Sequence, residues 1–218
     1  THHFDLVNFW LGTQPKTVYA QGDLMFYGKE NAEKRGVTQF YSRARGSGIA
    51  KSDPFALDLE SSELLKGLYA DAEHEDGYYR DQSVFGDGIS IEDTLGVLVR
   101  YKNKAILTYS LNAYLPWEGF QVHFNGSKGR MEVKVVEAPY VNSGGRKEDE
   151  GAAVMKRIRV IPMFGEAYDV PVEEGEGGHG GADPVMLNDL FGEPKPDPFR
   201  RAATHIDGAL SVLTDPAE

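Results

Sequence analysis

Three polar residues at the start of the chain have the types needed for acid–base chemistry. His2, His3 and Asp5 open a segment that is otherwise apolar. Positions 2 and 5 share one face of a helix, so the Asp5 carboxylate could orient or charge-stabilise the His2 imidazole, as a general acid or base requires. Judged by residue types alone, a helix-capping cluster or the remnant of a purification tag is the preferred explanation. A metal site is the least favoured explanation, because the three side chains do not all point in one direction.

A further histidine, His179, lies in a glycine-rich stretch that matches the pattern G-x-G-x-x-G between Gly175 and Gly180. This pattern holds a pyrophosphate inside a larger dinucleotide-binding domain, but only residues 181–218 follow it here. The carboxylates of the adjacent Glu173 and Glu174 would also repel a phosphate. We therefore expect no dinucleotide site. The glycines leave room for a ligand at His179, and an incidental histidine in a flexible loop is the alternative.

The stretch 76–87 combines aromatic rings with charged groups. Tyr78, Arg80 and Asp81 suit sugar recognition, because rings stack on the apolar face of a pyranose while charged groups bind its hydroxyls. An internal contact of Arg80 with Asp81 or Asp87 explains the same residues equally well. A Ser-His-Asp hydrolase has no support, since the chain lacks a G-x-S-x-G element.

Composition excludes several classes of function. The chain has 218 residues and a net charge of −11, which argues against a broad surface for nucleic acid or anionic membranes. It has no cysteine, so disulfides, thiolate metal sites and a cysteine nucleophile are excluded. No apolar stretch is long enough to span a bilayer, and no membrane partner is expected. The compartment stays undetermined, with the cytoplasm as the default expectation.

The spacing of apolar residues predicts helices near both ends of the chain. Residues 1–12 form a helix that Thr1 caps and Gly12 ends. Residues 16–27 read as a strand, residues 28–36 as a charged loop, and Ser61 or Ser62 caps a second helix. The last helices cover residues 183–191 and 200–213, the latter interrupted by Gly208.

Antiparallel strands fill the middle of the chain. Two hairpins are predicted, 91–101 with 105–114 and 121–124 with 130–136, the second turning at Asn125-Gly126, and together they form a four-stranded meander. A polar loop at 142–151 precedes strands at 154–161 and 168–172. The prediction is therefore an α+β fold, an open and predominantly antiparallel β-sheet with helices packed on one face, as a single domain over residues 1–218.

Four stretches together resemble a known family. The opening T-H-H-F-D-L-V-N-F-W-L-G resembles the Gfo/Idh/MocA oxidoreductases, the family of glucose-fructose oxidoreductase and inositol dehydrogenase. Residues 77–101, 109–132 and 178–183 agree with that family in order and spacing, so the resemblance covers nearly the whole chain. It implies a C-terminal sheet domain that follows a Rossmann domain absent from this chain.

The resemblance also implies roles for particular residues. His2 corresponds to the catalytic histidine of the family's D-x-x-x-H element, whose acidic residue would lie before Thr1. Substrate contacts are expected from a second set of side chains, namely His3, Asp5, Tyr78, Arg80, Asp81 and His179. The family's cofactor loop and its E-K-P lysine belong to the preceding domain. We therefore expect no NAD(P) bound to this fragment, and no turnover by the fragment alone.

These points predict the substrate-binding and oligomerisation domain of an NAD(P)-dependent oxidoreductase that acts on a sugar or cyclitol hydroxyl. One alternative is the domain of an NAD-dependent glycoside hydrolase of the same family. Another is a non-catalytic carbohydrate-binding or assembly module with the same fold. A homodimer or tetramer through the sheet face is expected. The sequence leaves open which sugar is bound, and whether NAD or NADP serves.

Overall fold

The computed structural model of the chain describes residues 1–138, 155–173, 175, 178–193 and 195–215. They fall into two compact units, which are described one at a time. The first unit holds Thr1–Tyr114 and the segment from Pro196, and the second holds Leu115–Lys195. The expected loop at 142–151 lies outside the described residues.

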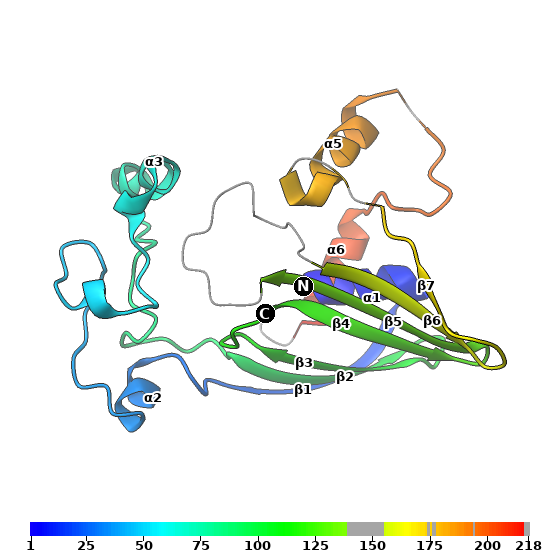
Figure 1. Ribbon diagram of the computed structural model, residues 1–218, viewed down its shortest axis with the longest axis horizontal. Helices are drawn as coiled ribbons and strands as arrows, with labels where there is room; N and C mark the ends of the chain where they lie inside the picture. Colours follow the sequence, from blue (N-terminus) through cyan, green and yellow to red (C-terminus); the bar gives the residue numbers. More distant parts are fainter. Residues whose placement is uncertain (139–154, 174, 176–177, 194, 216–218) are drawn as a thin grey trace. The chain divides into compact units, whose positions relative to one another are not determined.

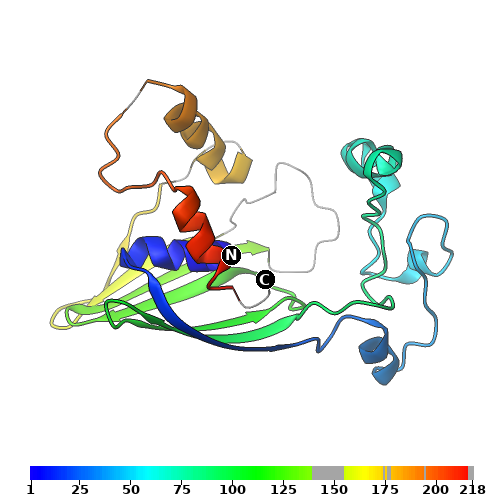
Figure 2. The ribbon, with the colours of Figure 1, turned by 180° about the vertical axis from the view of Figure 1, so that it is seen from behind.

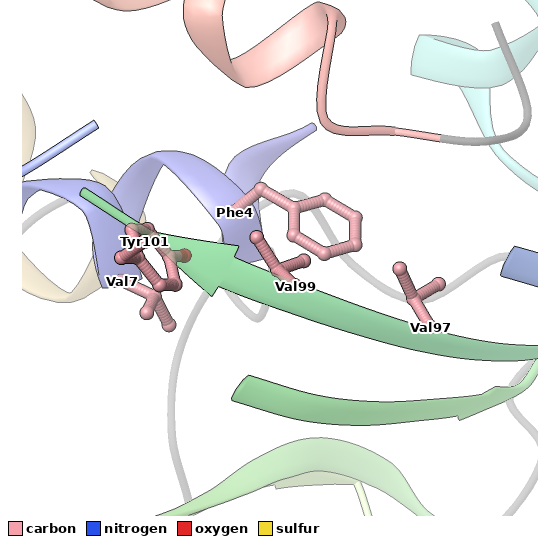
Figure 3. Packing of buried hydrophobic residues seen from close by; sticks show 5 residues of the cluster. All are labelled: Phe4, Val7, Val97, Val99 and Tyr101. Carbon is pink, nitrogen blue, oxygen red and sulfur yellow. The ribbon is translucent and has the colours of Figure 1, made fainter. Parts of the chain in front are cut away.

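The first unit is built on a three-stranded antiparallel sheet with the strand order β1-β2-β3. The strands are β1 (Pro15–Asp23), β2 (Thr94–Tyr101) and β3 (Ile106–Asn112), and the helix α1 (His2–Leu11) packs on one face (Figure 1). Alternate residues of a strand point to opposite faces, so β2 directs Val97, Val99 and Tyr101 toward α1. Phe4 and Val7 of the helix meet them, and all five are buried (Figure 3).

Between β1 and β2 the chain makes a long excursion of short helical segments. They are α2 (Lys29–Lys34), η1 (Ala50–Ser52), η2 (Leu59–Ser61), α3 (Glu63–Leu65), η3 (Lys66–Ala70) and α4 (Glu73–Asp76). The buried Asp93, at the end of the excursion, links it to its beginning. Its carboxylate accepts hydrogen bonds from the backbone N–H groups of Met25, Phe26 and Tyr27 at 2.7–2.9 Å. These bonds turn the backbone away after Asp23, which explains why β1 ends before the predicted residue 27.

The second helix of the first unit is α6 (His205–Val212), which lies beside α1 (Figure 2). A capping box starts α6: the Asp207 carboxylate accepts from the backbone N–H and the hydroxyl of Thr204, both at 2.7 Å. The Ser211 hydroxyl donates to the Thr1 carbonyl oxygen at 2.7 Å. This bond ties the last turn of α6 to the start of α1.

The second unit contains a four-stranded antiparallel sheet in the order β4-β5-β6-β7. Its strands are β4 (Glu118–Gly126), β5 (Gly129–Ala138), β6 (Met155–Pro162) and β7 (Tyr168–Val170), and they are followed by α5 (Gly178–Phe191). Residues 179–181 of α5 have left-handed backbone angles, so the regular helix begins after them. Pro184 then falls in the first regular turn, where a missing N–H costs no hydrogen bond.

The structure confirms the predicted α+β class with antiparallel strands and corrects several details. The four predicted meander strands are divided between two sheets, so β3 and β4 do not pair. The charged loop at 28–36 contains α2, and Gly208 lies inside a continuous α6. The second hairpin turns at residues 127–128 rather than at Asn125-Gly126, because the strand pairing continues to Gly126 and Gly129.

Candidate active site

The first turn of α1 presents the two neighbouring histidines in different environments. Phe4 is buried against the sheet, which fixes the turn, and His2 remains exposed. His3 Nδ1 and the Tyr109 hydroxyl of β3 share a hydrogen bond of 2.9 Å, and the Phe4 and Tyr109 rings lie 4.9 Å apart. His2 is thus a solvent-facing imidazole on a helix turn that its neighbours hold in place.

Burial is the main reason that the pKa of His3 lies below its ordinary value of 6.5. His3 therefore stays neutral at physiological pH, where it can exchange a hydrogen bond with Tyr109. Its observed contact is internal, and its predicted role at the substrate stays a prediction.

Asp5 lies on the wall of a groove beside α1. The groove has a volume of about 1000 Å³ and separates α1 from the segment leading into α6. No hydrogen bond joins Asp5 to His2 within the described ranges, although both residues lie on the first turns of α1. The role of Asp5 in orienting His2 stays a prediction.

The groove is lined by polar groups and aromatic rings. Asn8 shares its wall, and both side-chain polar atoms of Asn8 are buried without a hydrogen-bond partner among the described residues. Phe9 and Phe199, which also line the groove, are exposed. A carboxylate, an amide and two rings are the kinds of group that bind small polyhydroxylated ligands.

Asp81 is held inside the first unit by two arginines. Its carboxylate is 1% exposed and accepts from Arg43 Nε at 2.9 Å and from the Arg45 backbone N–H at 2.8 Å. Arg43 also pairs with Glu73 through both terminal nitrogens and lies over the Tyr79 ring. Glu73 and Asp81 raise the pKa of the Arg43 guanidinium, so Arg43 stays charged. We call this cluster the Arg43 clasp.

The clasp settles which internal contact Asp81 makes. The alternative considered from the sequence was a pair of Asp81 with Arg80, and the observed partner is Arg43. The substrate contact expected of Asp81 stays a prediction, and in this structure its buried carboxylate holds the loop in place. Sequence reasoning missed Arg43 because it lies 38 residues before Asp81 and no local spacing connects them.

Tyr78 and Arg80 lie on the exposed side of the loop that the Arg43 clasp fixes. Arg80 donates to the Tyr78 hydroxyl at 3.3 Å, and its guanidinium lies 5.2 Å from the centre of the Tyr69 ring. The bond to Tyr78 is the main reason that the pKa of Arg80 is raised. The structure therefore brings two predicted residues together and adds the ring of Tyr69 beside them.

His179 belongs to the second unit and has a carboxylate partner. Its Nδ1 lies 2.9 Å and 3.1 Å from the two carboxylate oxygens of Asp183. Sequence reasoning missed Asp183, although the four-residue spacing before a helix could have identified it. The seven predicted residues thus occupy three places: the start of α1, the loop fixed by the Arg43 clasp, and the start of α5.

The described residues do not fit a dinucleotide. Both sheets pair in antiparallel fashion, whereas dinucleotide-binding folds carry the phosphate loop between parallel strands and a helix. At Gly175 an added Cβ would lie 2.8 Å from the Gly180 carbonyl oxygen, so the glycines there pack against each other. Within the described part of the chain, no three His, Asp or Glu side chains converge as metal ligands. None of the described helices has the length and apolar character needed to cross a membrane.

Comparisons with known proteins agree with the fold. The family model for the C-terminal alpha/beta domain of the oxidoreductase family Gfo/Idh/MocA matches residues 1–197. A Bacillus subtilis (strain 168) protein that bears the name "Putative oxidoreductase YteT" is 34% identical over 210 residues. The alignment covers 92% of this chain and 46% of that protein, so the chain spans about half the length of this relative. The chain therefore belongs to the Gfo/Idh/MocA oxidoreductase family and corresponds to its C-terminal alpha/beta domain.

Proposed function

We propose that this chain is the substrate-binding domain of an NAD(P)-dependent oxidoreductase that acts on a hydroxyl group of a sugar or cyclitol. The observation that carries the proposal is the exposed His2 on the anchored first turn of α1, in a chain of an oxidoreductase family. A base of this kind is what the oxidation of an alcohol requires at the hydroxyl.

His2 is the proposed base. Its imidazole nitrogen can take the proton of a substrate hydroxyl in one direction and return it in the other. His3 and Phe4, which follow His2 in the chain, hold the first helix turn against the sheet, which limits the positions that His2 can adopt. Holding the base in place lowers the entropic cost of bringing it to the substrate hydroxyl.

The substrate class is argued from two sets of side chains in the first unit, those of the groove beside α1 and those of the exposed loop. The groove beside α1 offers Asp5, Asn8 and two aromatic rings, and the loop offers Tyr78 and Arg80. A polyhydroxylated ring has hydroxyls for the polar groups and an apolar face for the aromatic rings. These groups favour a sugar or cyclitol over an apolar alcohol.

The nicotinamide cofactor would be the hydride carrier of this reaction. Because the described residues do not fit a dinucleotide, we assign its binding to another part of the full-length protein and derive no step through it. The proposal thus makes this chain responsible for binding the substrate and for moving its proton.

The test uses the full-length protein with NAD+ or NADP+ and a panel of sugars and cyclitols, myo-inositol and D-glucose among them. Oxidation of one panel member with matching formation of reduced nicotinamide supports the proposal. Release of a free sugar from a glycoside without a net change in the cofactor would instead identify the glycoside hydrolase. Binding of sugars with no turnover at any pH would identify a non-catalytic module.

We also propose that two copies associate through the sheet face that lies opposite α1. On that face β1, β2 and β3 expose large apolar side chains, namely Tyr19, Leu98 and Ile106. A stable protein rarely leaves such groups together in water. Leu98→Asp is expected to lower the mass measured by light scattering to that of a monomer, while Lys104→Asp in the hairpin turn leaves it unchanged. A monomeric wild-type protein contradicts this assignment.

A further inference from the structure

The loop that leads into α6 is built around one carboxylate. The Asp197 side chain accepts a hydrogen bond from the backbone N–H of Ala202 at 2.9 Å, and the Arg200 backbone N–H donates to the Asp197 carbonyl oxygen at 3.2 Å. Hydrogen bonds from the backbone N–H groups of Ala202 and, next, of Arg201 lower the pKa of Asp197 below its ordinary value. These bonds fix the path of the loop and with it the place of residue 200.

Arg200 has a backbone conformation that disfavours any residue with a Cβ. Its φ of 53° lies in the left-handed region, which glycine adopts freely and in which other residues crowd their own carbonyl oxygen. Glycine would therefore serve the path of the loop better than arginine. The residue is exposed, so burial in a hydrophobic core does not explain it either. A strained residue that lacks a packing role indicates a functional role for its side chain.

The guanidinium of Arg200 has no ion-pairing partner, although carboxylates line the same groove. Arg200 shares the groove beside α1 with three of them, namely Asp5, Asp197 and Asp207. Asp197 is engaged by its own loop, and Asp207 accepts the two hydrogen bonds from Thr204 that start α6. In the part of the chain that the structure describes, Arg200 makes no ion pair with any of them. The groove therefore offers one guanidinium that can bind an anion from outside the chain.

Two further polar groups of the groove wall are uncommitted. The Asp5 carboxylate makes no hydrogen bond or ion pair to any other described side chain, and both polar atoms of the Asn8 amide are buried without a partner there. A carboxylate and an amide suit the hydroxyls of a ligand. Asp5 lies one helix turn after His2, so the groove wall lies along the helix face that carries the proposed base. The volume of about 1000 Å³ is sufficient for a sugar.

We propose that Arg200 binds a carboxylate of the substrate, so that the full-length protein prefers a sugar acid to the corresponding neutral sugar. The inference rests on the proposed function and narrows its substrate class. A guanidinium holds a carboxylate through two parallel hydrogen bonds, as a pair of one positive and one negative charge. A phosphate dianion would need more positive charge than one unpaired arginine supplies in a groove that three carboxylates line.

The likeness to the family does not assign this role to Arg200. The match to the family model ends at residue 197, and Arg200 lies after it. The role is argued from the left-handed backbone, the missing ion-pair partner and the place of Arg200 in the groove.

The direct test measures binding by the full-length protein, not turnover. Isothermal titration calorimetry at low ionic strength compares each neutral sugar of the panel with its aldonic acid, its uronic acid and its 6-phosphate. The wild type is expected to bind at least one acid about tenfold more tightly than the parent sugar, the effect of one charge-assisted contact, and more tightly than the phosphate. In Arg200→Gln this preference is expected to fall to about twofold or less. The matched control Arg35→Gln removes the same charge from the exposed end of α2, outside the groove, and is expected to keep the wild-type preference.

A second variant separates a role in binding from a role in the fold. Arg200→Gly relieves the left-handed strain, so the melting temperature is expected to rise by about 2 °C, while the preference for the acid is lost as in Arg200→Gln. If the arginine side chain served the fold instead, the same variant would lower the melting temperature. Differential scanning calorimetry and the binding titration on one protein preparation measure both properties.

The outcomes separate this proposal from the proposed function. A wild-type protein that binds no acid more tightly than its parent sugar, a preference that Arg200→Gln leaves unchanged, or tighter binding of the phosphate overturns the role of Arg200. Nicotinamide-linked oxidation of a neutral sugar would still support the proposed function in each of these cases. A preference for an acid that depends on Arg200, in a protein without nicotinamide-linked turnover, supports the carboxylate site and contradicts the proposed function alone.

Discussion

The start of α1 and the start of α5 each present a histidine, but they hold it by different means. At α1 the turn is anchored by burial: Phe4 packs in the core, and His3 is bonded to Tyr109 on a strand far along the chain. At α5 the histidine has a left-handed backbone, glycine neighbours and a partner four residues away. The first arrangement stabilises the fold at His2, and the second places His179 in a backbone conformation that costs stability.

Removing the main anchor of α1 is expected to have the largest effect. Phe4→Ala deletes a buried ring and is expected to lower the free energy of unfolding by about 3–5 kcal/mol. Phe9→Ala, on the same helix but 43% exposed, is the matched control and is expected to cost less than about 1 kcal/mol. Urea unfolding followed by circular dichroism measures both. Equal effects would show that α1 is not anchored through Phe4.

The strained histidine is expected to respond in the opposite direction. His179→Gly relieves the left-handed strain, and the free energy of unfolding is expected to rise by about 1 kcal/mol, with some of the gain offset by the flexibility of glycine in the unfolded chain. Asp189→Gly, within the regular part of α5, is expected to destabilise instead. Differential scanning calorimetry gives the sign. A loss of stability on His179→Gly would contradict the cost assigned to this position.

The hydrogen bond that links α1 to β3 is expected to have a smaller effect. Tyr109→Phe keeps the ring against Phe4 and removes only the hydroxyl that bonds His3, so a loss of about 1 kcal/mol is expected. The same change at Tyr19, which is exposed on the opposite face, is expected to have almost no effect. Chemical unfolding of the two variants side by side checks the difference.

The smallest expected effect is a pH dependence that comes from His3. The pKa of His3 is lowered in the folded chain and has its ordinary value of 6.5 in the unfolded chain. At a pH between these two values the unfolded chain therefore binds more protons than the folded chain. The stabilising contribution of neutral His3 is present above pH 6.5 and is lost as the pH falls through the folded pKa. Replacing His3 by Asn is expected to flatten the fall in stability on acidification, as unfolding curves at several pH values would show. An unchanged slope would mean that His3 is not desolvated.

Local patterns predicted the elements that carry a periodic signal. The helix at residues 1–12, its end at Gly12 and the hairpin around residues 102–104 are found in the structure, because apolar spacing and turn residues specify them locally. The segment α2 was missed, since Ala32 is its one buried residue and leaves no amphipathic pattern. The division of the strands into two sheets was missed as well, because hairpin signals do not determine how hairpins combine.

Long-range contacts at the candidate site could not be predicted. The bond of His3 to Tyr109 joins residues 106 positions apart, and Arg43 reaches Asp81 across the excursion. Such pairs depend on how the sheet and the excursion bring distant segments together, which residue types alone do not encode. The pair of His179 and Asp183 is the exception, because its four-residue spacing is visible in the sequence.

The most direct test of the account is the nicotinamide-linked turnover of His2→Asn in the full-length protein. The exposed His74, which lies near Glu75 on the excursion, provides the matched control His74→Asn. If His2 is the base, kcat falls by about 100-fold or more while the protein stays folded, and the control keeps wild-type activity. A His2→Asn protein that turns over substrate as fast as the control would contradict the central claim.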